Sequence, residues 1–168
     1  LNIGNIEPRK NALNSVKSIQ KADIPLILIG RKTKYYSEID NFITENKMKN
    51  VTHLSNVSQF ELACIYRLAT IFVYPSIFEG FGIPIIEALY SKIPVITNKS
   101  GVFPEAGGNH SVYIDPQSVE SIHASIIDLW ENIKKRKEIA DNGYQFVQKF
   151  NDELIANSWD ATYKNILK

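Results

Sequence analysis

Short apolar runs alternate with helix-like patterns along most of this chain, and that alternation restricts its fold more than any other feature. The runs occupy residues 1–4, 25–30, 51–54, 70–75, 94–97 and 112–114. The run PLILIG at 25–30 is apolar throughout, which is typical of a parallel strand covered on both faces. Strands separated by helices at this spacing predict right-handed crossovers and a parallel, doubly wound sheet.

Helical patterns fill the intervals between these strands and the whole C-terminal third. We expect helices over 11–22, 37–47, 58–69 and about 84–91; in the third, Ser58 and Glu61 have the spacing of a capping box. Beyond Pro116, three apolar stripes predict three further helices: Val119, Ile122, Ile126 and Trp130; Ile139, Tyr144, Phe146 and Val147; Leu154, Ile155, Trp159, Tyr163 and Ile166. The predicted fold is α/β: a single Rossmann-like domain over residues 1–168, with helices on both faces of a parallel sheet and a helical C-terminal tail.

Composition excludes several classes of protein. With 168 residues, 44% of them apolar and 22% charged, the chain can bury one core of ordinary size. The formal net charge of +1 argues against nucleic-acid binding, and KKRKE at 134–138 is expected on a solvated helix. The single Cys64 cannot form an internal disulfide, which favours a reducing compartment, and its context predicts a small buried residue.

The sequence contains no run long enough to span a membrane and no signal peptide. It opens with LNIGN, inside a predicted strand, so we expect a fragment of a larger protein. The three histidines, His53, His110 and His123, are scattered, and no His or carboxylate cluster has ligand spacing. We therefore predict no metal site.

In doubly wound sheets, ligands bind beyond the carboxyl ends of the strands. This rule selects GNIEPRKN at 4–11, GRKTKYY at 30–36 and PSIFEGFGIP at 75–84. In the last segment, Gly80 and Gly82 permit a close backbone approach, and Pro84 suits the first turn of a helix. The amides of Phe81, Gly82 and Ile83 would then face an anion such as a diphosphate.

Two glutamates flank this glycine turn. Glu87 lies about one turn into the following helix, where its carboxylate could accept hydrogen bonds from a vicinal diol such as a ribose. Glu79 precedes the turn and could reach a different hydroxyl group across the phosphates. The alternative is that both are surface residues beside a turn.

Two cations belong to the first selected segment. Arg9 and Lys10 would stand at the same rim of the sheet, where they could neutralise a diphosphate leaving group. The alternative for them is a solvated helix start.

Read in order, four segments resemble a known family: GNIEPRKN, FVYPSIFEGFGIPIIEAL, IPVITNKSGVFPEAGG and VYIDPQS. They match the C-terminal domain of glycosyltransferase family 4, whose members are retaining, sugar-nucleotide-dependent enzymes of the GT-B fold. The resemblance covers residues 1–168. It implies that the chain is the C-terminal, donor-binding half of such an enzyme and lacks the N-terminal acceptor domain.

The resemblance also implies roles for individual residues. Lys10, with Arg9 beside it, matches the lysine that contacts the diphosphate. Glu79 matches the first glutamate of an E-x7-E element, near the donor sugar and the reaction centre, and Glu87 matches the one that binds ribose. The amides of the glycine turn would meet phosphate or sugar. The nucleobase would pack near Gly30 and Val57.

One position departs from the family pattern. Many members carry an Arg directly after the first glycine, here Gly4, whereas this chain has Asn5. Either Arg9 supplies the missing charge or the sugar donor binds more weakly.

The implied reaction is transfer of a glycosyl unit from a nucleoside diphosphate sugar, GDP- or UDP-linked, to an acceptor hydroxyl with retention, without a metal or cofactor. EPRKN resembles bacterial polysaccharide mannosyltransferases, which favours GDP-mannose. The acceptor, a sugar or a lipid-linked glycan, would bind the missing domain. The fragment alone would then be inactive. We expect a cytoplasmic protein that reaches the inner membrane face through that domain.

Three alternatives remain. GT-B-like UDP-sugar epimerases share the architecture, but as a rule lack the glutamate pair and EPRKN. A dehydrogenase nucleotide-binding domain would need G-x-G-x-x-G in the first turn, which is absent. A non-catalytic domain that binds nucleotide or a protein partner is the third.

Overall fold

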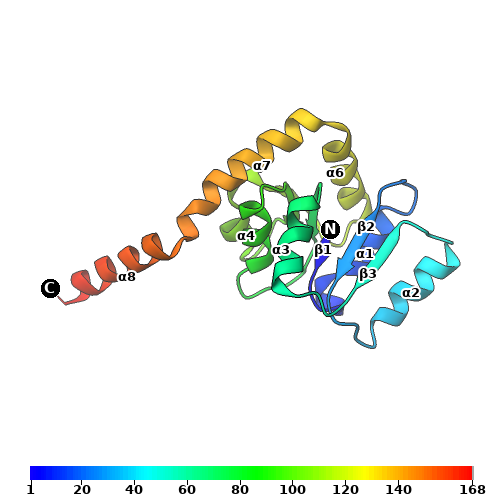
Figure 1. Cartoon of the computed structure of the whole chain (residues 1–168), viewed down its shortest axis with the longest axis horizontal. Helices are drawn as coiled ribbons and strands as arrows, with labels where there is room; N and C mark the ends of the chain where they lie inside the picture. Colours follow the sequence, from blue (N-terminus) through cyan, green and yellow to red (C-terminus); the bar gives the residue numbers. More distant parts are fainter. Residues whose placement is uncertain (168) are drawn as a thin grey trace.

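The structure, a computed structural model, describes residues 1–167. Two parallel three-stranded sheets form its centre, and Figure 1 labels the strands of the first. The first has the order β1-β2-β3 and the second the order β4-β5-β6. Their bounds are β1 Asn2–Ile3, β2 Leu26–Ile29, β3 Val51–Leu54, β4 Phe72–Tyr74, β5 Val95–Asn98 and β6 Val112–Ile114.

The two sheets meet edge to edge at β1 and β4. The amino group of Leu1 donates to the carbonyl of Ile71 at 2.9 Å, and the N–H of Val73 donates to the carbonyl of Leu1 at 2.9 Å. Leu1 thus bonds through its amino group to one residue of the neighbouring strand and through its carbonyl to the residue two positions later. This is the hydrogen-bond pattern of adjacent parallel strands. The spatial order is therefore β3-β2-β1-β4-β5-β6, and the prediction of a parallel, doubly wound sheet is confirmed.

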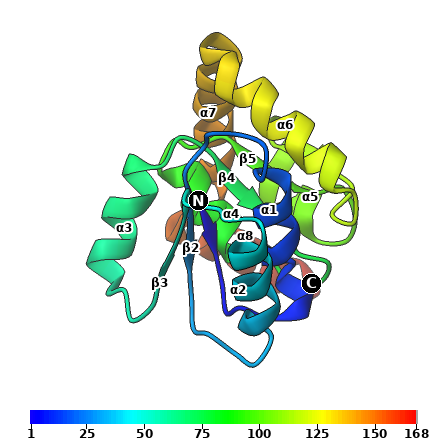
Figure 2. The same ribbon diagram turned by 90° about the vertical axis from the view of Figure 1, so that its right-hand side faces the viewer.

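Side chains of β4 alternate between the two faces of the sheet. Ile71 and Val73 belong to the core shared with α1 Ala12–Ser18, α2 Tyr36–Glu45 and α6 Val119–Glu131. Phe72 and Tyr74 belong to the core on the opposite face, shared with α3 Gln59–Leu68, α4 Ile83–Tyr90, α5 Phe103–Gly107 and α7 Ile133–Val147. Figure 2 shows α3 on one side of the strands and α1 and α2 on the other. Helices thus cover both faces.

The local predictions hold with a few exceptions. Strands 51–54 and 112–114 have the predicted bounds, and the capping box of Ser58 and Glu61 begins α3. The predicted helix 11–22 ends at Ser18, where the N–H groups of Ile19, Gln20 and Ala22 donate to carbonyls three residues earlier and form tighter turns. The side-chain amide of Asn50 donates to the carbonyls of Ala22 and Ile24 in the segment that follows. The sequence analysis missed α5 and the short 3-10 helices η1 Pro8–Lys10, η2 Gly108–His110 and η3 Gln148–Phe150.

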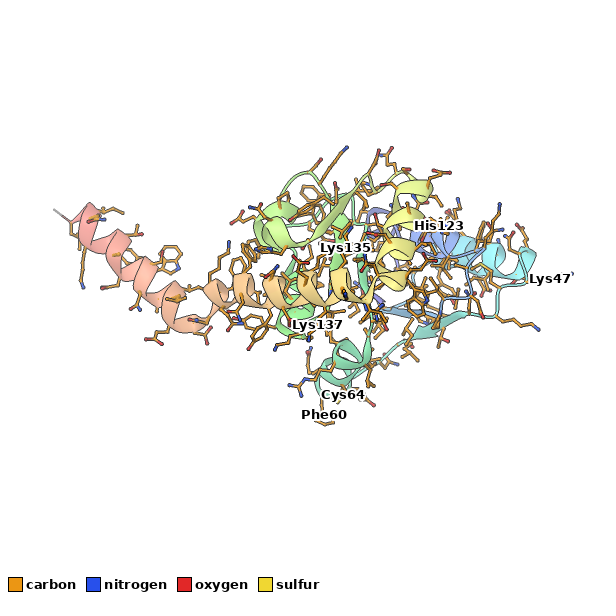
Figure 3. All side chains as sticks on the ribbon, turned by 90° about the horizontal axis from the view of Figure 1, so that it is seen from above. Lys47, Phe60, Cys64, His123, Lys135 and Lys137 are labelled. Atoms are coloured by element: carbon orange, nitrogen blue, oxygen red, sulfur yellow. The ribbon has the colours of Figure 1, made fainter. Side chains whose placement is uncertain are left out.

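One burial prediction was wrong. Cys64 is exposed, and with Phe60 it lies on the outer side of α3 (Figure 3). The reason is that α3 packs on the domain through Tyr66, its one buried residue, so the side bearing Cys64 faces solvent. Trp130 is 37% exposed, and Leu129 takes its place in the buried stripe of α6.

The C-terminal helix α8, Asp152–Ile166, extends away from the domain (Figure 1). Its apolar side chains, Leu154, Ile155, Trp159 and Tyr163 among them, are exposed. The basic run at 134–138 lies at the start of α7, where Lys135 and Lys137 face solvent as predicted (Figure 3). Within residues 1–167, every helix is too short or too polar to cross a membrane.

Candidate functional site

The strand order reverses between β1 and β4, and the two segments that follow these strands meet there. The N–H of Ile77 donates to the carbonyl of Arg9 at 2.8 Å, and the hydroxyl of Ser76 donates to the same carbonyl at 3.0 Å. The side-chain amide of Asn11 donates to the carbonyl of Pro75 at 3.2 Å. A doubly wound sheet binds ligands at this kind of reversal.

A carboxylate and two cations form the centre of the site. Oε1 of Glu79 accepts hydrogen bonds from Nζ of Lys10 at 2.6 Å, from the hydroxyl of Ser76 at 2.6 Å and from the hydroxyl of Tyr74 at 2.8 Å. Its Oε2 lies 3.3 Å from Nη1 of Arg9. The side chains of Lys10 and Glu79 are only 12% and 11% exposed. The carboxylate is therefore held by groups from both segments.

These bonds decide the protonation state of Glu79. Burial is the largest single influence and opposes ionisation. The hydrogen bonds from Lys10, Ser76 and Tyr74, with the charge of Lys10, together outweigh it, so the pKa of Glu79 is lowered. An ionised Glu79 fixes the ammonium group of Lys10, which also donates to the Tyr74 hydroxyl at 2.8 Å. Two of the three ammonium N–H bonds thus have partners among residues 1–167, and the third can donate to a ligand.

Arg9 and Asn5 complete this rim. Arg9 is half exposed and pairs with Glu7 at 3.1 Å as well as with Glu79. Asn5 is exposed, and its neutral amide contributes no charge at this position. Gly4 lies against Lys10: a Cβ built on Gly4 would stand 3.3 Å from the Cε of Lys10. The cationic part of the site consists of Arg9 and Lys10.

The glycine turn opens α4 as predicted. Gly82 is the N-cap with φ of 103°, a conformation that suits glycine, and Pro84 lies in the first turn. Gly80 is exposed, with open space around its Cα. The ring of Phe81 packs edge-on against Phe150, with centroids 5.6 Å apart. The first N–H groups of a helix, here including that of Ile83, have no intrahelical partner and attract anions.

Glu87 lies one turn into α4 and is half-buried. Its Oε2 accepts a hydrogen bond from the hydroxyl of Tyr66 on α3 at 2.9 Å. Burial, followed by the charge of Glu87, raises the pKa of Tyr66, so the phenol keeps its proton and remains a donor. Sequence reasoning missed Tyr66 and Tyr74, although a tyrosine within a buried apolar pattern signals a hydroxyl that needs a partner.

Two residues predicted near a nucleobase lie at the carboxyl ends of β2 and β3. Gly30 directly follows β2, and its carbonyl oxygen lies 2.8 Å from Nε2 of His53. A Cβ on Gly30 would stand 2.0 Å from the carbonyl oxygen of Gly4, so only glycine fits there. Val57 is half-buried beside a hollow between the end of β3 and α3.

The histidines make local contacts within the fold. Nδ1 of His123 lies 2.6 Å from the carbonyl oxygen of Ser18, and His110 packs edge-on against Phe146. Among residues 1–167, no group of three or more His, Cys, Asp or Glu is placed to hold a metal ion.

The family model for glycosyl transferases group 1 matches residues 1–146. The chain belongs to this family. O-antigen chain mannosyltransferase RfbU of Salmonella typhimurium is 31% identical over 98% of this chain and 47% of its own length. O-antigen chain mannosyltransferase B of Escherichia coli is 31% identical over 98% of this chain and 45% of its own length. The chain therefore spans about half the length of these curated relatives.

Solved structures give the same fold. A glycosyltransferase from Rickettsia africae matches 99% of this chain and 48% of its own chain, with a TM-score of 0.87 at 22% identity. The C-terminal domain of a glycosyl transferase group 1 family protein, LpcC from Francisella tularensis, matches 88% of this chain and 83% of its own, with a TM-score of 0.79 at 26% identity. The fold is that of the C-terminal half of GT-B glycosyltransferases, as the resemblance implied.

Proposed function

We propose that this chain is the donor-binding half of a retaining glycosyltransferase and binds a nucleoside diphosphate sugar. The observation that carries the proposal is the cluster of Lys10, Arg9 and Glu79 at the strand-order reversal, beside the glycine turn that opens α4. Family membership supports it independently.

The diphosphate would lie between the cations and the turn. Lys10 and Arg9 neutralise it as it leaves, and the amides of Phe81, Gly82 and Ile83 donate to its oxygens. Positive charge that is already in place before the reaction stabilises the leaving group without reorganisation. Glu79 acts by holding both cations in position.

The nucleoside would extend from the diphosphate along α4 and toward β2. Glu87 accepts hydrogen bonds from the two ribose hydroxyls, and the base packs near Gly30 and Val57. The reaction centre lies on the Glu79 side of the phosphates. The bonds that Glu79 accepts from Lys10, Arg9, Ser76 and Tyr74 support this positioning role, and we assign it no nucleophilic role.

We further propose GDP-mannose as the sugar donor. The support is that two relatives at 31% identity are named O-antigen chain mannosyltransferases, and a third, at 26%, is named MMP alpha-(1->4)-mannosyltransferase. UDP-sugars are the competing class, because HepE from Anabaena, which shares the fold with a TM-score of 0.85, was solved in complex with UDP and glucose.

The full enzyme would act in polysaccharide synthesis in the bacterial cytoplasm, without a metal or cofactor. An acceptor sugar or lipid-linked glycan would bind the other half of the protein, because this chain corresponds to about half of its relatives.

Titration calorimetry tests the proposal. The chain is titrated with GDP, UDP and ADP and then with the matching sugar nucleotides, with EDTA in the buffer. We expect tightest binding of GDP, and weaker binding to a Lys10→Ala variant. Failure of every nucleotide to bind, both to this chain and to a two-domain protein that contains it, would refute the proposal. Preference for UDP would refute only the choice of sugar donor.

A further inference from the structure

Each glutamate that flanks the glycine turn is bonded to one buried tyrosine. The hydroxyl of Tyr74, which is 1% exposed, donates to Glu79, and the hydroxyl of Tyr66, which is 3% exposed, donates to Glu87. The function proposed above assigns roles to the two carboxylates and none to the tyrosines. What the tyrosines do for the carboxylates is the open question.

The two tyrosine rings are joined by a third aromatic side chain. Phe72 lies between them, 5.6 Å from the ring of Tyr66 in a tilted contact and 5.6 Å from the ring of Tyr74 in a stacked one. Phe72 is fully buried on β4. Aromatic rings packed in this way have few alternative rotamers, so the two hydroxyl groups are held at a fixed separation.

Glu87 needs such a support more than Glu79 does. Glu79 accepts hydrogen bonds from four side chains, whereas Tyr66 provides the one side-chain hydrogen bond found at Glu87 among the described residues. A glutamate side chain on a helix surface has several rotamers. A ligand that binds only one of them must restrict the side chain to it, which costs conformational entropy. The Tyr66 hydroxyl selects one rotamer before the ligand arrives.

We propose that Tyr66 is a positioning residue that orients the Glu87 carboxylate toward the ribose of the sugar donor. The inference rests on the proposed role of Glu87. Oε2 is occupied by the Tyr66 hydroxyl, which leaves its second lone pair and both lone pairs of Oε1 for the vicinal 2′- and 3′-hydroxyls. Because burial and the charge of Glu87 raise the pKa of Tyr66, the phenol keeps its proton at a pH where an ordinary tyrosine would ionise.

Tyr66→Phe tests the proposal, because it keeps the ring and its packing on Phe72 and removes the hydroxyl alone. Binding is measured by calorimetry with two probes, GDP and 2′,3′-dideoxy-GDP. A single hydrogen bond of this kind predicts a loss of roughly fivefold in affinity for GDP. The affinity for 2′,3′-dideoxy-GDP should be unchanged, so the ratio of the two affinities falls. Equal losses for both probes, or no loss for either, would overturn the proposal.

Two further variants separate this inference from the proposed function. Glu87→Ala should abolish the preference for GDP over 2′,3′-dideoxy-GDP, and adding Tyr66→Phe to it should cause no further change. If Glu87→Ala has no effect, the ribose contact itself is wrong. If Glu87→Ala removes the preference and Tyr66→Phe does not reduce it, the contact stands and the positioning role is refuted.

Tyr113→Phe is the matched control. It removes a half-buried hydroxyl that donates to the carbonyl of Gly108, outside the proposed site. Both tyrosine variants lose a hydrogen bond to an oxygen acceptor, so both should lower the melting temperature. Only Tyr66→Phe should change the ratio of the two affinities.

Discussion

Replacing Glu79 by Gln should lower the free energy of unfolding of the domain by about 2 kcal/mol at pH 7. Glutamine keeps the shape of the side chain and retains one oxygen to accept the bonds now made by Lys10, Ser76 and Tyr74. The bonds from Ser76 and Tyr74 lose their charge assistance, and the bond from Lys10 keeps its charged donor but loses the opposite charge on its acceptor. A charge-assisted hydrogen bond is roughly twice as strong as a neutral one. Three bonds that each lose about 0.5–1 kcal/mol give this magnitude.

The effect should depend on pH in a known direction. The pKa of Glu79 is lowered in the folded state, so its stabilising contribution is present above the unfolded pKa of about 4.3 and is lost as the pH falls through the folded pKa. The difference between the wild type and Glu79→Gln should therefore shrink in acid. Glutamine does not titrate, so the variant should have the flatter pH profile.

Urea unfolding followed by circular dichroism, at a series of pH values from 7 down to 3, measures this difference. Asp128→Asn is the control, because the Asp128–Lys135 pair has the same 2.6 Å separation as Lys10–Glu79 but is 43–46% exposed. Exposed pairs contribute about 0–1 kcal/mol, so this variant should lose little. Equal losses in the two variants, or a Glu79 difference that does not shrink in acid, would refute the reasoning.

Four other substitutions have defined outcomes. Lys10→Ala should weaken binding of nucleoside diphosphates at least tenfold and leave binding of the free nucleoside nearly unchanged, by calorimetry; equal losses would mean that Lys10 acts on folding. Gly30→Ala should destabilise the domain by about 3 kcal/mol or more in urea unfolding, because its Cβ would meet the carbonyl of Gly4, whereas Gly80→Ala, in open space, should cost under about 1 kcal/mol. Ser58→Ala should cost about 1 kcal/mol through loss of the N-cap of α3, and an unchanged midpoint would contradict the capping role.

The fold was predictable because it depends on patterns local to the chain. Continuous apolar runs predicted the buried strands, and the spacing of Ser58 and Glu61 predicted where α3 begins. Whether a helical residue is buried depends instead on which side of the helix meets the domain. The sequence of α3 carries apolar residues on more than one side, and for this reason Cys64 was wrongly placed in the core.

That Lys10 and Glu79 lie at the same edge of the sheet was predictable from the sequence, and their hydrogen-bond partners were not. The rule for doubly wound sheets selected the segments that contain Lys10 and Glu79, and the structure brings both together. The contact of Glu79 with a hydroxyl of the sugar donor stays a prediction; the structure pairs it with cations and with Tyr74. Such partners depend on side-chain rotamers across the join between β1 and β4, which sequence patterns do not encode.

The join between β1 and β4 also has a consequence for how the domain folds. Lys10 and Glu79 are 69 residues apart in the chain, and they meet only after β1 has paired with β4. Contacts between such distant residues require closure of a long loop and form slowly. In a refolding experiment, helices such as α3 should therefore appear well before any capacity to bind nucleotide. The onset of nucleotide binding during refolding would then report when the two halves of the sheet dock.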